Sequence, residues 1–211
     1  MLKLNKPYRY TQAEWQHVST ILIPYVRLHG GQKGWDKADN VTKDLKNRIS
    51  EFTLIQQECR CAYCEAFIPG GAQLDHFVPK QLHPEFCYEP KNLITSCAVC
   101  NMYIKNAGDT IALPAKRRYE QNQFTIVHPY FNDPDIHIKY TNEDRVVIDR
   151  SNSTDLGKAT IDFFGLNDYP AYAQRAQQFG DMGKYPIDFI KWAKACSASP
   201  SNISHSCRAM V

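Results

Sequence analysis

The stretch that decides the fold begins with Cys61-Ala-Tyr-Cys64 and ends with Cys97-Ala-Val-Cys100. Each Cys-x-x-Cys turn can present two thiolates on one side, and Zn²⁺ prefers four soft ligands arranged as a tetrahedron. The paired spacing therefore predicts a four-thiolate zinc site formed by Cys61, Cys64, Cys97 and Cys100. Two unrelated pairs of reduced cysteines are the alternative, and Cys59 is a competing ligand.

Composition and charge describe an ordinary globular chain of 211 residues, of which 43% are hydrophobic and 22% charged. A net charge of +3 and a pI of about 8.4 permit nucleic-acid binding but do not predict it. The N-terminus has no apolar signal-peptide core, and no apolar run is long enough for a membrane span. We expect a cytoplasmic protein without a membrane partner, in which eight cysteines favour metal binding over disulfides.

Hydrophobic periodicity and turn residues predict an α+β fold in four parts. The parts are an N-terminal helical segment (1–57), a zinc-stabilised core (58–118), a C-terminal segment with a β-hairpin and helices (119–196), and a flexible tail (197–211). Pro24 is expected to end or kink the first helix. The expected helices are 11–27, 39–57, 98–106, 154–165, 169–180 and one that begins near Pro186, and the expected strands are 73–77, 92–95, 124–128, 136–140 and 145–149.

The residues between the cysteine pairs suit metal-assisted hydrolysis of a phosphodiester. The order is Asp75-His76, then Asn92, then Asn101 directly after the last cysteine. A neutral histidine can take a proton from water at pH 7, so His76 is the candidate general base. On a regular strand Asp75 points away from His76, although a strand end or bulge relaxes that alternation. Lys105 lies one helical turn after Asn101 and could meet a phosphate.

In this order the motif resembles the HNH endonucleases, whose core is a ββα-metal finger. The resemblance implies that Asp75 reaches a catalytic metal ion and that Asn92 orients the base and braces its loop. Asn101 stands where many members carry histidine, and it would supply the second protein ligand. A carboxylate and an amide leave most of the coordination shell to water and phosphate, which suits Mg²⁺, with Mn²⁺ as the alternative.

The chain outside the core carries a narrower resemblance. Cys61-Ala-Tyr-Cys64-Glu65, the sequence His-Pro-Tyr-Phe-Asn-Asp-Pro at 128–134, and Thr160-Ile-Asp-Phe-Phe-Gly-Leu-Asn167 followed by Arg175 carry it. They resemble the PtuB-like nuclease subunits of Septu antiphage defence systems and their retron-associated relatives. That resemblance implies an ABC-type ATPase partner, which forms a complex with the nuclease and restrains or triggers it.

The function expected from these features is a metal-dependent endonuclease with DNA as substrate. RNA, including tRNA, is an alternative substrate, because the chemistry requires only a phosphodiester. Two non-catalytic functions compete with this one: a zinc finger that binds nucleic acid without cutting, and an adaptor for protein contacts. Neither of them requires a general base. The cluster Lys116-Arg117-Arg118 could contact a nucleic-acid backbone, and a solvated charge run is an equal alternative.

Overall fold

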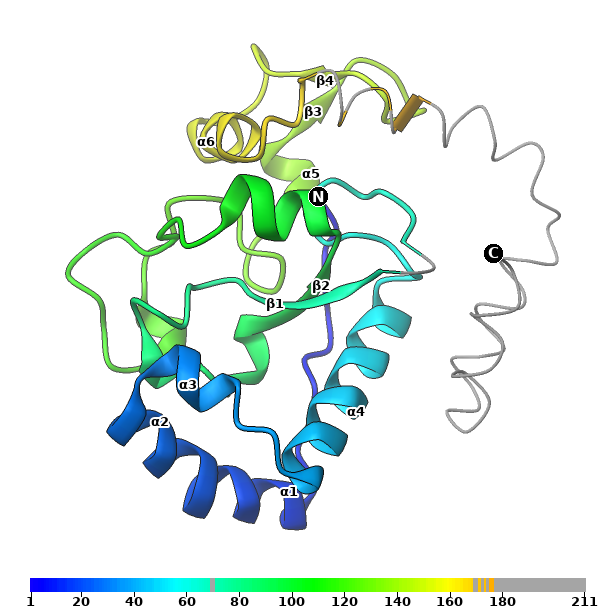
Figure 1. Cartoon of the computed structure of the whole chain (residues 1–211). Coiled ribbons are helices and arrows are strands. Elements are labelled where there is room, and N and C mark those ends of the chain that lie inside the picture. Colours follow the sequence, from blue (N-terminus) through cyan, green and yellow to red (C-terminus); the bar gives the residue numbers. More distant parts are fainter. Residues whose placement is uncertain (69–70, 169–170, 172, 174, 177–211) are drawn as a thin grey trace, which may run out of the picture.

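A short antiparallel sheet and the helix that follows it occupy the centre of the fold (Figure 1). Strands β1 (Gln73–His76) and β2 (Leu93–Ser96) pair so that Asp75 faces Ile94 and His76 faces Leu93. The π-helix η4 (Val99–Lys105), bright green in Figure 1, lies over this sheet. The computed structural model describes residues 1–68, 71–168, 171, 173, 175 and 176. The expected α+β class and these central elements are confirmed.

Five helical segments form a layer on the opposite side of the sheet (Figure 1). Thr11 caps the first of them through a capping box with Glu14. Pro24 does not end the helix, because the helical run continues to His29 after a π-turn closed by the bond from Ile23 N–H to Val18 O. The segments are α1 (Gln12–His17), η1 (Val18–Leu22), α2 (Ile23–His29), α3 (Gly31–Trp35) and α4 (Asn40–Gln56).

The glycines at 30–34 belong to the turn into α3 and to α3 itself. Gly30 has a φ of +83°, which favours glycine and turns the chain between α2 and α3. A Cβ atom on Gly31 would lie 1.8 Å from the carbonyl oxygen of Lys80. Glycine is therefore required here for close approach, and it brings α3 against the segment that follows β1.

Two hydrophobic clusters stabilise the two sides of the sheet. The first joins η1, α2, α3 and α4 to the sheet through residues such as Leu22, Ile49 and Leu93. The second contains the four predicted zinc ligands together with Phe77 and Phe164. The sheet and its connecting loop thus lie between two buried apolar layers, which fixes the residues that the loop carries.

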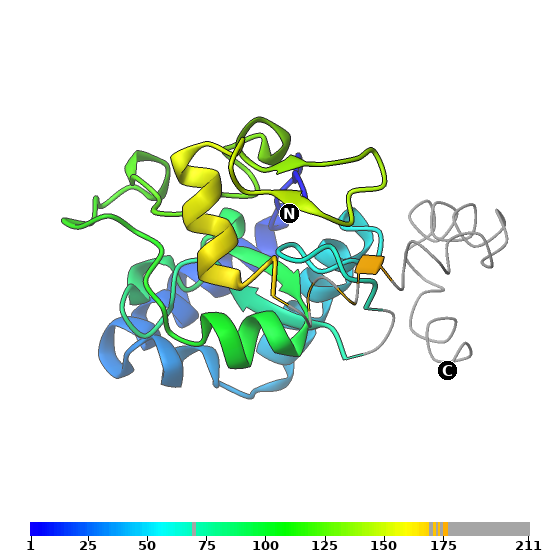
Figure 2. The same ribbon diagram turned by 90° about the horizontal axis from the view of Figure 1, so that it is seen from above.

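The C-terminal part covers the far side of η4. Figure 2 shows α6 (Asp155–Phe164) beside the bright green η4, and the two helices are in contact. The remaining elements are α5 (Pro134–His137), β3 (Lys139–Tyr140), β4 (Ile148–Asp149) and the short 3₁₀ turns η2 (Pro84–Phe86), η3 (Pro90–Asn92) and η5 (Tyr119–Gln121).

The predicted helix at 154–165 is confirmed, and the predicted hairpin is confirmed in the shorter form β3–β4. The strand predicted at 124–128 is wrong: this segment forms only an isolated bridge between Ile111 and Phe124. Its apolar residues are buried in the second cluster without strand pairing. The helix expected at 169–180 lies mostly outside the described residues, and the helix from Pro186 and the tail at 197–211 lie wholly outside them.

In the described part of the chain, every helix is too short or too polar to cross a membrane.

Candidate functional site

The four predicted zinc ligands form a buried cluster. The Sγ atoms of Cys61, Cys64, Cys97 and Cys100 all lie within 4.8 Å of one another. The separation between Cys64 and Cys97 is 3.8 Å, which matches the ~3.8 Å between sulfurs in a tetrahedron with Zn–S bonds of ~2.3 Å. The donor set and spacing therefore fit Zn²⁺, and Cys59 is not part of the cluster.

One backbone hydrogen bond closes the first Cys-x-x-Cys turn, and a second attaches this turn to the central sheet. Cys61 N–H donates to Ala66 O, and Ala62 N–H donates to Thr95 O on β2. A thiol hydrogen bond from Cys100 is the largest cause that lowers the pKa of Cys64 and of Cys97. These two sulfurs are therefore the ones most readily present as thiolates, the form that binds metal.

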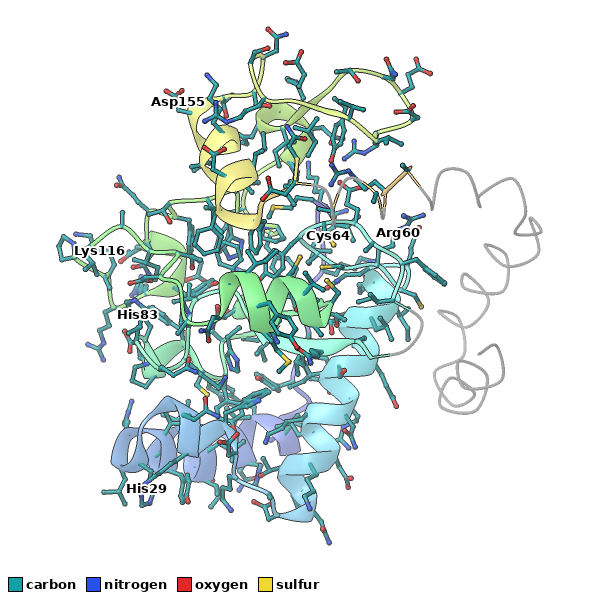
Figure 3. All side chains as sticks on the ribbon, turned by 45° about the horizontal axis from the view of Figure 1, so that its top comes forward. His29, Arg60, Cys64, His83, Lys116 and Asp155 are labelled. Carbon is teal, nitrogen blue, oxygen red and sulfur yellow. The ribbon has the colours of Figure 1, made fainter. Side chains whose placement is uncertain are left out.

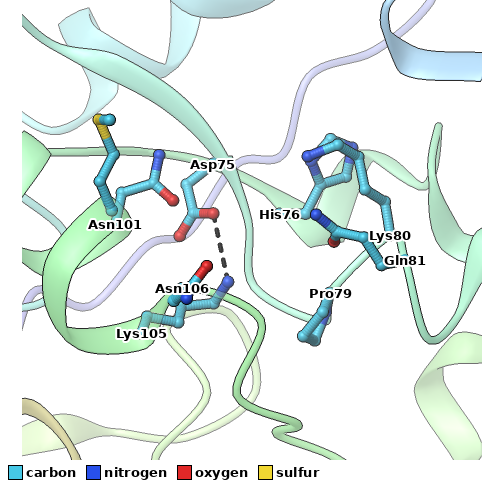
Figure 4. A pocket seen from close by; sticks show the side chains of 9 residues that line it. Asp75, His76, Pro79, Lys80, Gln81, Asn101, Lys105 and Asn106 are labelled. Carbon is cyan, nitrogen blue, oxygen red and sulfur yellow. Dashed lines mark hydrogen bonds and ion pairs between the residues drawn. The ribbon is translucent and has the colours of Figure 1, made fainter. Parts of the chain in front are cut away.

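A polar pocket of about 220 Å³ lies between the sheet, η4 and the loop after β1. Figure 4 shows Asp75, Asn101 and Lys105 on one side of it, and His76 with Lys80 on the other. The lining residues are Asp75, His76, Pro79, Lys80, Gln81, Asn101, Met102, Lys105 and Asn106. The structure thus brings three of the four predicted catalytic residues to one pocket.

His76 is held in a defined tautomer. Its Nε2 lies 2.9 Å from the carbonyl oxygen of Cys87, which can only accept, so Nε2 carries the proton. Trp35 of α3 packs edge-on against the imidazole at 4.4 Å between ring centroids. Burial lowers the pKa of His76 well below its usual value, and the positive charge of Lys80 lowers it further. The ring is therefore neutral at pH 7 with its lone pair on Nδ1.

Asp75 is engaged by this chain at both carboxylate oxygens. The buried Tyr63 hydroxyl donates to Oδ2 at 2.6 Å, and the Lys105 ammonium donates to Oδ1 at 3.2 Å (Figure 4). Lys105 and Asp75 have side-chain exposures of only 1% and 6%. This buried ion pair differs from the expected phosphate-binding position of Lys105, although the lysine still lines the pocket.

Asn92 lies behind the pocket and braces the loop that follows His76. Its Oδ1 accepts from Val78 N–H at 2.6 Å, and its Nδ2 donates to the carbonyls of Val78 and Phe86. The Tyr119 hydroxyl donates to the same Oδ1 at 3.0 Å. Asn92 is fully buried, so these four bonds satisfy its amide and hold both ends of the loop.

Asn101 lies beside Asp75 on the same side of the pocket (Figure 4). Its Nδ2 donates to Gln73 Oε1 at 2.9 Å, which turns the amide oxygen toward the carboxylate (Figure 4). An amide oxygen beside a carboxylate fits the hard oxygen ligands that Mg²⁺ and Mn²⁺ prefer. Asp75 and Asn101 would hold such an ion, with the Lys105 ammonium as its close neighbour.

The predicted basic cluster lies apart from these residues. Lys116, Arg117 and Arg118 are all exposed and precede the turn η5. Figure 3 shows Lys116 at one edge of the molecule, near His83, with Cys64 on the other side of η4. Asn122 fixes this segment by accepting from Lys116 N–H and donating to the carbonyls of Lys116 and Arg118.

Three residues that sequence reasoning assigned no role belong to the site. Tyr63 holds Asp75, the Cys87 carbonyl holds His76, and Lys80 lines the pocket beside the base. Among the described residues, no ion pair or hydrogen bond engages the Lys80 ammonium, and burial lowers its pKa. Tyr63 lies inside the first Cys-x-x-Cys turn, and Lys80 follows the Asp75-His76 motif. Their nearness in sequence to the motif was the signal that could have found them.

Comparison with known proteins gives one relationship. No family model matches the chain. Over 111 residues the sequence is 27% identical to the Septu protein PtuB of Bacillus thuringiensis. The matched stretch is 51% of this chain and 37% of the length of that protein. This similarity supports a distant relationship to Septu proteins, in agreement with the narrower resemblance of the motifs.

Proposed function

We propose that this chain is a metal-dependent endonuclease of the HNH type that hydrolyses phosphodiester bonds in DNA. The observation that carries the proposal is the pocket in which His76, with its proton on Nε2, lies beside Asp75 and Asn101. A binding module requires no histidine of fixed tautomer, and an adaptor requires no oxygen ligands beside it. The cysteine cluster, suited to Zn²⁺, supports the same proposal because it ties β2 and η4 to the first turn.

The Nδ1 atom of His76 is the base in this proposal. It takes a proton from a water molecule, whose oxygen forms a bond to phosphorus while the bond to the 3′ oxygen breaks. The Cys87 carbonyl keeps the other nitrogen protonated, so the ring cannot present the wrong atom. Asn92 contributes indirectly by holding the loop from Val78 to Phe86 in place.

The residues on the other side of the pocket are suited to bind the charged phosphate. Asp75 and Asn101 would hold Mg²⁺ or Mn²⁺, which supplies charge for the developing phosphorane and the leaving 3′ oxygen. The Lys80 ammonium lines the same pocket and is available to a phosphate oxygen. Lys116, Arg117 and Arg118 are exposed and could contact a more distant part of the backbone.

The test is cleavage of supercoiled plasmid DNA by the purified chain with Mg²⁺ or Mn²⁺. We expect His76→Ala to lower the rate by at least about 100-fold, the usual contribution of a general base. His29→Ala, which removes an exposed histidine of α2, is the matched control and should cut normally. Equal cleavage by the parent and His76→Ala would refute the assignment. An RNA of the same sequence, tested in parallel, distinguishes the substrate.

By the similarity to a Septu protein, we also propose a role in antiphage defence with an ATPase subunit as partner. Co-purification of an ABC-type ATPase with the chain from its native cells would test this partner. Cleavage that appears only in the resulting complex would support a restrained nuclease. Full cleavage by the isolated chain, unchanged on addition of the ATPase, would contradict control by that subunit.

A further inference from the structure

The buried pair of Lys105 and Asp75 has a consequence for metal binding. Lys105 Nζ lies 3.2 Å from Asp75 Oδ1, and both side chains are almost completely shielded from water. The other carboxylate oxygen accepts a 2.6 Å hydrogen bond from Tyr63. The carboxylate that would hold a divalent cation is therefore already neutralised by a cation of this chain.

A divalent cation on Asp75 would lie within a few ångströms of the Lys105 ammonium, whichever oxygen it uses. Like charges at such a separation repel strongly when water is excluded. Within the described residues, Asp75 is the one anionic side chain that pairs with Lys105. The described part of the chain offers the ammonium no second anion, but a phosphate in the pocket would supply one.

We propose that Lys105 makes the metal site conditional on substrate. In the free chain its ammonium holds Asp75 and keeps the affinity for a divalent cation low. When a phosphodiester enters the pocket, Lys105 pairs with the phosphate, and Asp75 is released to bind the ion. Metal and nucleic acid therefore bind cooperatively, each raising the affinity for the other by the same factor. This inference rests on the proposed function, because it requires a phosphodiester in the pocket.

The primary test measures Mn²⁺ binding to the free, full-length chain from the electron paramagnetic resonance signal of unbound Mn²⁺. We expect Lys105→Gln to bind Mn²⁺ at least about tenfold more tightly than the parent, because the competing charge is gone while an amide donor remains. Lys105→Arg keeps the charge and should bind weakly. Lys43→Gln, on the exposed face of α4, is the matched control. Unchanged Mn²⁺ affinity in Lys105→Gln would overturn the inference.

A second measurement requires no change at Lys105. In the His76→Ala background, which prevents cleavage, a DNA or RNA oligonucleotide should raise the Mn²⁺ affinity at least about tenfold, after subtraction of Mn²⁺ bound by the nucleic acid alone. Tight Mn²⁺ binding without either oligonucleotide, or no gain with both, would overturn the inference. Cleavage that depends on His76 would leave the proposed function standing in either case, whereas its absence both from the isolated chain and from the complex with the ATPase subunit would refute the function itself.

Discussion

Replacing Tyr63 with phenylalanine removes the hydroxyl that connects the cysteine cluster to the Asp75 carboxylate. Tyr63 is fully buried between Cys61 and Cys64, and its ring stacks on Phe164 at 4.2 Å between centroids. Phenylalanine keeps this stacking and leaves no cavity beyond the missing hydroxyl. The change therefore isolates the hydrogen bond to Asp75, which is 2.6 Å long.

The size of the expected effect follows from the charge and burial of the acceptor. A hydrogen bond to a charged group contributes about 1.5 to 3 kcal/mol to the free energy of unfolding, and complete burial places this bond in the middle or upper part of that range. Asp75 would retain Lys105 as its second partner, which prevents a larger loss. With a urea m-value of about 2 kcal/mol/M, the midpoint of unfolding should fall by about 1 M.

The assay is urea unfolding of the zinc-loaded chain, followed by circular dichroism, with zinc content measured on the same samples. Zinc content should not change, because all four thiols remain. Tyr103→Phe is the matched control, since Tyr103 is 78% exposed and should shift the midpoint by less than about 0.2 M. A shift as small as this in Tyr63→Phe would refute the reasoning that Tyr63 stabilises Asp75.

Three further predictions concern the cysteine cluster, Asn92 and His128. Cys64→Ser should lose zinc and unfold more readily, whereas Cys59→Ser should keep about one zinc per chain in native mass spectrometry, because Cys59 lies outside the cluster. Asn92→Ala should lower the free energy of unfolding by about 3 to 5 kcal/mol in urea titrations, because it leaves buried backbone groups without partners; a loss below about 1 kcal/mol would contradict the bracing role. Burial lowers the pKa of His128 to about 3, so the folded chain binds fewer protons than the unfolded chain. The stability that this histidine contributes is complete above about pH 6.5 and falls by about 3 kcal/mol by pH 4. Its imidazole resonances should not titrate above pH 4 in the folded chain but should titrate near pH 6.5 in urea, and titration near pH 6.5 in the folded chain would contradict this account.

The sequence allowed the cysteine cluster and the central elements to be predicted because their signals are local. Cys-x-x-Cys spacing, strand composition and a capping residue each act within a few positions. The prediction of helix boundaries was wrong where a second structural feature compensates for a helix-breaking residue. Pro24 follows a π-turn within one continuous run of helices, and Gly31 belongs to α3 at a point where the Lys80 carbonyl leaves no room for a Cβ atom. Neither compensation has a signature in the sequence.

The partners of the proposed catalytic residues were the least predictable part of the site. Asp75 and His76 were found from their order, but the Cys87 carbonyl and Tyr63, which engage them, come from the loop and the cysteine turn. Lys105 was expected to meet a phosphate, yet the fold buries it on Asp75. Such contacts depend on how separate segments pack, which short-range patterns do not encode.

The two sides of the pocket differ in how easily their interactions can be exchanged for others. On the side of the base, a directed chain of hydrogen bonds runs from Tyr130 N–H to His128 Nδ1, from His128 Nε2 to the Tyr119 hydroxyl, and from there to Asn92. These are uncharged, buried groups, and Ser96 Oγ is the one buried side-chain polar atom of the described residues that lacks a partner. Moving the base would break several satisfied bonds at once.

On the side of Asp75, by contrast, one ion pair with Lys105 sets the charge. Either partner of this ion pair can be replaced by another ion of the same charge without disturbing the hydrogen bonds around Asn92. Because breaking a buried pair is costly unless both charges find new partners, the exchange must involve a cation for Asp75 and an anion for Lys105 together. Under the proposed function, ions and substrate would therefore control this site through the Asp75 carboxylate, while the loop would keep His76 fixed.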